Sequence, residues 1–356
     1  MSIIVSIKKR LSPLFTLEAE FETGRGCLGI LGASGSGKSM TLKCIAGIEA
    51  PDAGRITVHG KTLFDSRRRI NLRPQARKVG CLFQHYALFP AMTVMGNITA
   101  AMTGPPRENR RKAQTWIGRL GLGGLEGRYP SQLSGGQQQR AALARMLAQE
   151  PDAVLLDEPF SALDYPLREA TQLELLETLE RFGEQGGSIL VTHSRDEAYR
   201  LCQDLVVMDK GRVADRGPMK ALFQDPSTVQ SAVMTGCKNI SPAKRTGPRS
   251  LFALNWGLEL RTSRIIGPHI THTGIRAHDL APLWGKEDLM RPPFYNRVRP
   301  LLRRCSEEPF ERTLLFTNAR ARTLDESGEI WWKRPKMRQG LPAALFFPPE
   351  AVLLLR

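Results

Sequence analysis

Apolar residues recur at every second position near the start of the chain, which predicts strands. Residues 3–7 and 15–21 both alternate in this way, a pattern typical of strands with one buried face. Residues 27–31 form a short apolar run between glycines and predict a fully buried strand. Residues 39–46 then show helical spacing. The pattern therefore predicts an antiparallel β flank followed by strand, loop and helix.

Further along, buried-strand runs alternate with helical patterns, as they do in an α/β fold. The expected strands are residues 52–60, 78–84, 153–158 and 188–193, and the expected helices are 93–98, 107–127, 141–147 with its start near 134, and about 166–182. Residues 240–356 instead show short strands broken by Pro and Gly. The alternation of strands and helices predicts an α/β domain before this region. A small all-β accessory domain, an oligonucleotide-binding-like barrel, is expected at 236–356.

Composition adds size and compartment to this picture. The chain has 356 residues, and its 41% hydrophobic content is enough for cores in two domains. It has no apolar run long enough to span a bilayer, and its first residues lack the order of a secretion signal, so we expect a cytoplasmic protein. The six cysteines show no C-x-x-C spacing, which favours buried core residues over a zinc site or a disulfide framework.

The formal net charge of +16 makes nucleic acid, anionic lipid and acidic small molecules the partner classes to consider. Most of the excess lies in residues 231–356. The longest basic run, Arg67–Arg68–Arg69, is as consistent with a solvated loop face as with a contact site. A surface for single-stranded nucleic acid requires aromatic residues interleaved with basic ones. This chain does not show that pattern. Charge alone therefore identifies no partner.

Residues 32–39 match G-x-x-x-x-G-K-[ST], the pattern of a phosphate-binding loop between a strand and a helix. The glycines let successive N–H groups turn onto phosphate oxygens at the N-terminus of the helix. Lys38 would add a positive charge at the transferring phosphate, and Ser39 would place its hydroxyl on Mg²⁺. The expected nucleotide-binding residues here are Gly32, Ala33, Ser34, Gly35, Ser36, Gly37, Lys38, Ser39 and Met40.

Polar residues follow other expected strands at their carboxyl ends, where ligands bind in open α/β sheets. Asp157 is expected to hold the Mg²⁺ shell and Glu158 to polarise the attacking water. Gln84 is expected at Mg²⁺ or at that water, the alternative being an ordinary strand-ending residue. His193 is expected to contact the γ-phosphate, although a single histidine is more often structural. Phe15 either stacks on adenine or belongs to the core, and the pattern leaves both open.

A second helix N-terminus suited to phosphate begins at Ser134. The hydroxyl of Ser134 and the amides of Gly135 and Gly136 can bind an anion there, and Gln137 completes the expected set. An N-capped helix after a glycine turn also explains Ser134 and the glycines, but not the polar run 137–140. Because these amides and the loop at 32–39 lie on different helices, one chain cannot easily bring both to one γ-phosphate. Two copies are therefore expected.

Together these motifs resemble the ATP-binding cassette (ABC) family. The likeness covers about residues 1–235 and rests on the loop at 32–39, Gln84, the signature 133–137, the strand ending in Asp157 and Glu158, the turn 161–164 and His193. It implies a head-to-tail homodimer in which the signature of one subunit closes on ATP held by the other. It also implies an ATPase cassette at 1–235 with a helical subdomain at about 85–150, and that this subdomain and Gln84 contact membrane permease subunits.

A narrower likeness is to importer ATPases of the molybdate/sulfate type. It rests on residues 235–241, 274–278 and 345–350. The expected function is therefore an ATPase, using ATP and Mg²⁺, that powers uptake of an oxyanion at the cytoplasmic face of the inner membrane. Molybdate is expected first, with tungstate and sulfate as alternatives, and a solute-binding protein is expected as an indirect partner. The Ser-x-Arg-Asn motif of molybdate-binding accessory domains is absent, so a regulatory oxyanion site is not indicated.

Two other functions are less consistent with the sequence. A nucleic-acid-linked cassette protein would account for the charge, but such proteins carry two cassettes or one split by a coiled coil, whereas this chain has one uninterrupted cassette. No nucleic-acid partner is therefore expected. A sensor that does not hydrolyse ATP would lack Glu158 or His193, and both are present.

Overall fold

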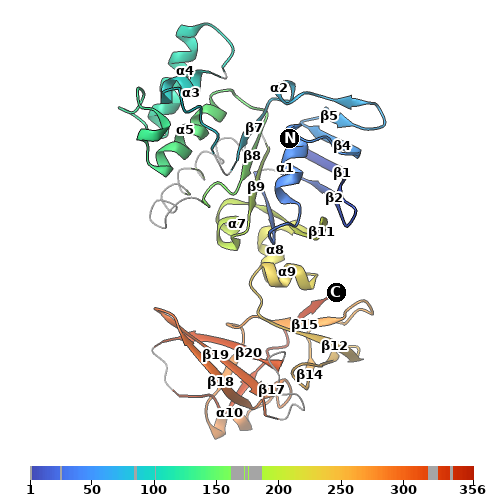
Figure 1. The fold of residues 1–356 in the computed structure, drawn as a ribbon. Coiled ribbons are helices and arrows are strands. Elements are labelled where there is room, and N and C mark those ends of the chain that lie inside the picture. The colour runs from blue at the N-terminus through green and yellow to red at the C-terminus, as the bar shows by residue number, and fades with distance from the viewer. Residues whose placement is uncertain are drawn as a thin grey trace. The chain divides into compact units, whose positions relative to one another are not determined.

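The computed structural model describes residues 2–24, 26–83, 86–100, 102–161, 172, 175, 187–319, 328–336 and 340–356. The chain forms two compact units, a first unit of residues 1–220 and a second unit of residues 221–356 (Figure 1).

One large sheet runs through the first unit. Its strand order is β6-β5-β4-β1-β2-β11-β10-β3-β9-β8-β7. Strands β7, β8, β9, β3 and β10 are parallel, whereas β6, β5, β4, β1 and β2 form the expected antiparallel flank. The bounds are β1 Ile3–Ser12, β2 Phe15–Glu22, β3 Cys27–Gly32, β4 Ala53–Val58, β5 Lys61–Asp65, β6 Ile70–Asn71, β7 Val79–Leu82, β8 Ala153–Asp157, β9 Gly187–Thr192, β10 Asp204–Asp209 and β11 Arg212–Pro218.

The helices of the first unit are short, and three of them, α3, α4 and α5, gather beside β7 (Figure 1). The bounds are α1 Lys38–Ala46, α2 Pro74–Arg77, α3 Val94–Thr99, α4 Pro106–Arg119, the 3₁₀ turn Pro130–Gln132, α5 Gly135–Leu147 and α7 Arg195–Leu201. A further helix, α8 Met219–Gln224, begins in the first unit and ends in the second. Of the helices described, none is long and apolar enough to cross a membrane. Apart from residues 172 and 175, the helix expected at 166–182 lies outside the described residues.

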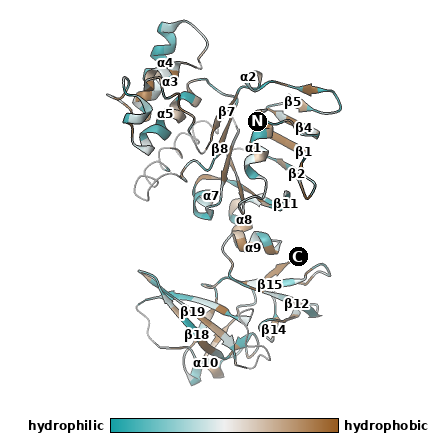
Figure 2. Cartoon of the chain, in the orientation of Figure 1, coloured by the Kyte–Doolittle hydropathy of each residue, from teal (hydrophilic) through white to brown (hydrophobic). Residues whose placement is uncertain are grey.

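Helix α4 ends at Arg119, earlier than the limit of 127 expected from its basic amphipathic pattern. Gly121 and Gly124 both have positive φ, so the chain turns there and cannot continue as a helix. Ile117 and Leu120 are buried, as that pattern predicts. The rest of α4 is largely hydrophilic, in contrast to the apolar strand β8 (Figure 2).

The core of the first unit surrounds α1, because apolar residues of the flank and of the parallel strands meet on it. Arg77 is wholly buried at the C-terminal end of α1. Its Nη1 donates to the carbonyls of Cys44 and Ile45, at 2.8 Å each. Burial lowers the pKa of Arg77. Its charge therefore lies where the last-turn carbonyls of the phosphate-loop helix need donors.

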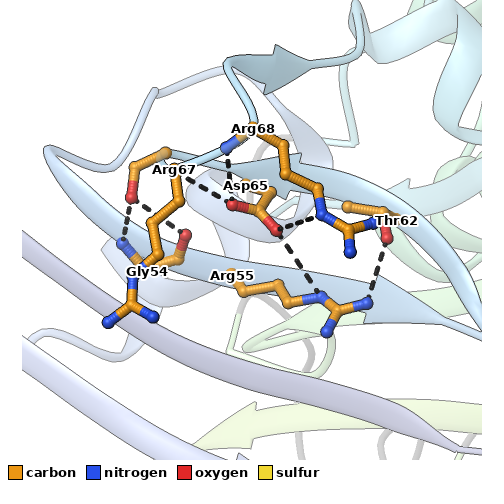
Figure 3. Close-up of polar contacts among 7 residues, drawn as sticks. Gly54, Arg55, Thr62, Asp65, Arg67 and Arg68 are labelled. Atoms are coloured by element: carbon orange, nitrogen blue, oxygen red, sulfur yellow. Dashed lines mark hydrogen bonds and ion pairs between the residues drawn. The ribbon is translucent and has the colours of Figure 1, made fainter.

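The basic run at 67–69 forms the turn between β5 and β6 (Figure 3). Asp65, which is buried, accepts hydrogen bonds from the backbone N–H groups of Arg67 and Arg68 at 3.0 and 3.1 Å. Its other oxygen lies 3.9 Å from Nε of Arg55 and 4.0 Å from Nε of Arg68. The three arginine side chains of the turn are exposed, as a solvated loop face would be.

Antiparallel sheets build the second unit, as expected. One sheet has the order β14-β13-β12-β15-β22, a second β16-β21-β17 and a third β18-β19-β20. Trp256, Phe316 and Phe347 are at the centre of one shared core. The bounds are α9 Val229–Met234, β12 Asn239–Gly247, β13 Ser250–Ala253, β14 Leu258–Arg261, β15 His272–Ile275, β16 Ala281–Leu283, α10 Lys286–Met290, β17 Arg297–Val298, β18 Pro300–Glu307, β19 Glu311–Asn318, β20 Ile330–Pro335, β21 Ala344–Phe346 and β22 Leu353–Leu355.

Residues 221–235 belong to the second compact unit, although the motifs place the end of the cassette at 235. Ala232 of α9 packs with Cys237, Leu353 and Leu355 in a small apolar cluster. The N–H of Val229 also donates to the last carbonyl of the chain, at Arg356. The domain limit of 235 and the barrel closure of the second unit stay predictions.

Candidate functional site

The phosphate loop leaves β3 at Gly32 and enters α1 at Lys38, as the pattern predicts. Gly37 has φ +104 and caps the helix without a side chain. Gly35 has φ +78, and a β-carbon built on it would meet no atom within 4 Å, so the loop faces open space there. Among the described residues, the buried hydroxyl of Ser36 has no hydrogen-bond partner. The loop therefore presents unsatisfied donors at a helix N-terminus, which suits a phosphate group.

Lys38 folds back over this loop. Its Nζ donates to the carbonyls of Gly32 at 2.8 Å and Ala33 at 2.9 Å. Burial lowers the pKa of Lys38, against the attraction of Glu158 and Asp157. The ammonium is thus held at the loop by weak neutral acceptors, which phosphate oxygens can replace.

Ser39 and Asp157 meet from two elements. The Ser39 hydroxyl donates to Oδ1 of Asp157 at 3.0 Å, where Asp157 ends β8. Burial is the main reason that the pKa of Asp157 is raised, and the Ser39 hydrogen bond opposes it. A hydroxyl and a carboxylate in contact are the oxygen donors that Mg²⁺ takes beside phosphate, with water as its other ligands. These two residues therefore fit the expected ion.

Glu158 and His193 lie together at the ends of adjacent strands. β8 and β9 pair in parallel with Asp157 opposite Val191. His193 Nδ1 lies 3.3 Å from Oε2 of Glu158. Glu158 has φ +46, and its N–H donates to the Val191 carbonyl at 2.9 Å. The Ser161 N–H and hydroxyl both donate to the Glu158 carbonyl, so this strained backbone is held from two sides.

A buried carboxylate behind His193 was not predicted from the sequence. Glu197 accepts a 2.5 Å hydrogen bond from the Thr192 hydroxyl, and Thr192 ends β9 directly before His193. The Ser194 hydroxyl accepts from the N–H of Glu197 and caps α7. The only signal in the sequence is the S-x-x-E spacing of an ordinary helix cap, which does not predict that Glu197 turns back to the strand.

Ser134 caps α5 in the structure. Its hydroxyl accepts from the N–H of Gln137, and Gln137 Oε1 accepts from the N–H of Ser134 at 3.0 Å. This reciprocal cap gives Gln137 a local role that the sequence did not predict. No hydrogen bond or ion pair within the described part of the chain joins residues 134–137 to residues 32–39. The two expected phosphate sites of one chain are thus not brought together (Figure 1).

Of the remaining expected residues, the structure describes Phe15 and Met40 but not Gln84. Phe15 begins β2 and is half-buried, and a β-carbon on Gly211 would lie 3.3 Å from its Cζ. The Gly211 N–H in turn donates to the Ser36 carbonyl, so Phe15 lies beside a turn that contacts the phosphate loop. Met40 packs partly against the core. Gln84 and residues 162–164 lie outside the described residues.

One family profile and several proteins named for ATP-binding in import match this chain. A family profile described as ABC transporter matches residues 16–161. A molybdenum import ATP-binding protein of Paramagnetospirillum magneticum is 40% identical over 214 residues, 60% of this chain and 58% of the relative. An Fe(3+) ions import ATP-binding protein of Brucella abortus is 39% identical over 218 residues, 60% of each chain. A sulfate/thiosulfate import ATP-binding protein of Synechocystis sp. is 37% identical over 252 residues, 68% of each chain.

This chain thus spans about three fifths of the length of the molybdenum and iron relatives. Among solved structures, cbiO1 of Clostridium perfringens, part of an ABC transporter complex, is 28% identical with a TM-score of 0.54 over 62% of this chain and 90% of that one. A dimeric post-hydrolysis ATP-binding cassette bound to ADP and Pi has a TM-score of 0.52 at 24% identity, over 62% of this chain and 99% of the other, and shows the same fold.

Proposed function

This chain belongs to the ABC transporter family, and on that premise we propose that it hydrolyses ATP to drive import of a solute. One observation carries the proposal: a lysine, a hydroxyl with its carboxylate, and a glutamate with its histidine converge on the N-terminus of α1. The import direction is supported by the relatives, which are named as import ATP-binding proteins.

The phosphate loop binds the β- and γ-phosphates through its backbone N–H groups. Lys38 exchanges the Gly32 and Ala33 carbonyls for phosphate oxygens and neutralises their charge. Ser39 and Asp157, now hydrogen-bonded to each other, would hold Mg²⁺, and the bound ion would draw charge from the phosphate oxygens. The stacking of Phe15 on adenine is part of the proposal, supported by its place beside the loop.

Glu158 accepts the proton of the attacking water. Its carboxylate is partly exposed and lies 3.3 Å from Nδ1 of His193, so the imidazole orients it. The His193 side chain is 64% exposed and is therefore free to contact the γ-phosphate. Glu197 fixes the residue before His193 through Thr192, which holds the histidine at the strand end. Gln84 is proposed at the Mg²⁺ or the water.

Hydrolysis takes place between two copies of the chain. Ser134, Gly135, Gly136 and Gln137 lie at the start of α5, without polar contact to the phosphate loop of the same copy. In a head-to-tail homodimer they reach ATP held by the other copy. Closure on ATP and release after hydrolysis would then move α3, α4 and α5, which we propose to contact membrane permease subunits at the cytoplasmic face of the inner membrane.

The transported solute is proposed to be an oxyanion, molybdate first and tungstate or sulfate next. Two of the relatives are named for molybdenum and sulfate/thiosulfate, but the one named for Fe(3+) is about as similar. Cells lacking this chain should lose uptake of labelled molybdate and keep uptake of Fe(3+). Loss of Fe(3+) uptake with normal molybdate uptake would contradict the oxyanion assignment.

The ATPase is tested by Glu158→Gln. We expect phosphate release to fall about 10²–10⁴-fold because the proton acceptor is lost. ATP binding should persist, since the phosphate contacts remain. Glu22→Gln, an exposed glutamate at the end of β2, is the matched control and should hydrolyse ATP normally. Near-normal phosphate release by Glu158→Gln would overturn the assignment.

A further inference from the structure

Two cysteines far apart in the sequence are in contact at the start of β3, the opposite end of the strand from the phosphate loop. The sulfur atoms of Cys27 and Cys202 lie 3.5 Å apart. Cys27 is the first residue of β3, the strand that leads to the phosphate loop, and Cys202 directly follows α7, the helix that begins after His193. Both side chains are buried, with 4% and 6% exposure.

The backbone around the sulfurs fixes this contact. The N–H of Gln203 donates to the Cys27 carbonyl at 2.9 Å, and the N–H of Cys27 donates to Oε1 of Gln203 at 2.7 Å. A β-carbon on Gly29 would lie 3.3 Å from Sγ and 3.4 Å from Cβ of Cys202. Cys202 therefore occupies the space that Gly29 leaves open, on the face of β3 that also carries Cys27.

We propose that Cys27 and Cys202 are a site of oxidative modification, at which a peroxide joins their sulfur atoms in a disulfide. The Cys27 thiolate attacks one oxygen of hydrogen peroxide, and the sulfur becomes a sulfenic acid as the other oxygen leaves and takes a proton as water. Cys202 then attacks that sulfur, loses its proton and expels a second water. Two thiols and one peroxide thus give one disulfide and two waters.

The environment assigns the order of attack. The hydrogen bond from the Cys202 thiol lowers the pKa of Cys27, whereas burial raises the pKa of Cys202. The thiolate is the nucleophile, so Cys27 reacts first. Burial raises the pKa of Cys44 and of Cys237 to about 11 and that of Cys81 to about 12, which makes these thiols poorer nucleophiles.

The bond would join two elements that lead to the site, β3 and α7. A disulfide holds its sulfurs about 2 Å apart, so the 3.5 Å contact must close and draw the end of α7 toward β3. α7 begins next to His193 and β3 ends at the phosphate loop. The bond therefore restrains the histidine relative to the loop and slows ATP turnover. This effect on rate rests on the proposed ATPase, whereas formation of the bond does not.

The test uses the full chain, oxidised with hydrogen peroxide, alkylated, digested and analysed by mass spectrometry. We expect a peptide pair joined through Cys27 and Cys202, with a loss of about 2 Da for the two hydrogens. ATP turnover of the same sample should fall about fivefold or more and recover with dithiothreitol. Cys202→Ala and Cys27→Ser should form no such pair and keep their turnover. Cys305→Ser removes an exposed cysteine of the second unit and should behave as the unsubstituted chain.

The absence of the linked peptide under conditions that oxidise Cys305 would overturn the proposal. An equal, reversible loss of turnover in both Cys202→Ala and Cys27→Ser would refute the effect of the bond on rate. A linked peptide without any change in turnover would refute the effect on rate. If the reduced chain shows no turnover at all, the ATPase proposal fails, and the linked peptide still decides whether the pair is oxidised.

Discussion

The phosphate site of the first unit and the core of the second unit use buried polar groups in opposite ways. In the first unit, Lys38 and Asp157 are buried although burial disfavours the charged form of each. Their partners are a few carbonyls and one hydroxyl. In the second unit, the wholly buried Asn239 has both ends of its amide paired with the backbone of Trp331, at 2.8 and 2.6 Å. Asn296 is paired in the same way with Arg261 and Phe347.

The difference separates a site from a scaffold. Asn239 joins the start of β12 to the backbone of β20, and Asn296 joins the backbone of Arg261 in β14 to that of Phe347 after β21, so both asparagines stabilise the second unit. The charges of the first unit are held at a cost to stability that a ligand would repay. Replacing one of these asparagines should therefore destabilise the protein. Replacing one of the buried charges should instead disable the protein and leave it folded.

Lys38→Ala gives the largest expected effect on ATP binding. The lysine faces phosphate charge in the bound ground state, so its loss should weaken ATP binding by about tenfold to a hundredfold or more. The melting temperature without nucleotide should not fall, since burial already disfavours the charge. Calorimetric titration with ATP and thermal unfolding measure the two quantities.

Lys43→Ala is the control for this variant, because Lys43 lies in the last turn of the same helix. It should bind ATP as the unsubstituted chain does. Unchanged ATP affinity in Lys38→Ala, or an equal loss in Lys43→Ala, would remove the basis for treating Lys38 as part of the site.

Asn239→Ala gives the largest expected effect on stability. It leaves the partly buried N–H and carbonyl of Trp331 without their partners, which should cost about 1–3 kcal/mol. Thermal unfolding should show an earlier transition, while ATP turnover of the folded fraction stays normal. A stable variant that hydrolyses ATP slowly would show that the second unit is not a passive scaffold.

Asp157→Asn gives the smallest expected effect on stability. Because burial raises the pKa of Asp157, the native protein holds this proton to a higher pH than the unfolded chain does. Ionisation then costs stability as pH rises through that interval. The variant should therefore melt roughly 2–4 °C higher at pH 7, lose this gain at a pH well below the ordinary carboxyl pKa, and show no Mg²⁺-dependent turnover. A lower melting temperature at pH 7 would contradict the cost assigned to this carboxylate.

Much of the first unit could be predicted from the sequence. The family resemblance and the fold class, an α/β cassette followed by antiparallel β sheets, are confirmed. The reason is physical: glycines at 35 and 37, a lysine after them and polar residues at strand ends occur where the backbone and the parallel sheet require them. The roles assigned to these residues stay predictions, as does the choice of molybdate.

Contacts that depend on how separate elements pack against one another could not be predicted from the sequence. Glu197 reads as a helix cap, and only the position of α7 against β9 turns it toward Thr192. Cys27 and Cys202 have no spacing that marks them as a pair, because parallel strands bring distant segments together. In the second unit, the asparagine pairs depend on register between short strands, and alternation alone does not fix which residues meet.

The central claim is that ATP is bound between two copies of the chain, and light scattering on Glu158→Gln tests it most directly. With ATP and Mg²⁺ the mass should double relative to the nucleotide-free protein, because the variant closes on ATP without releasing it. Adding Ser134→Arg, which places a bulky charge at the start of α5, should abolish the doubling while each chain still binds ATP. If the mass is the same with and without ATP, or if doubling survives Ser134→Arg, the shared site is contradicted.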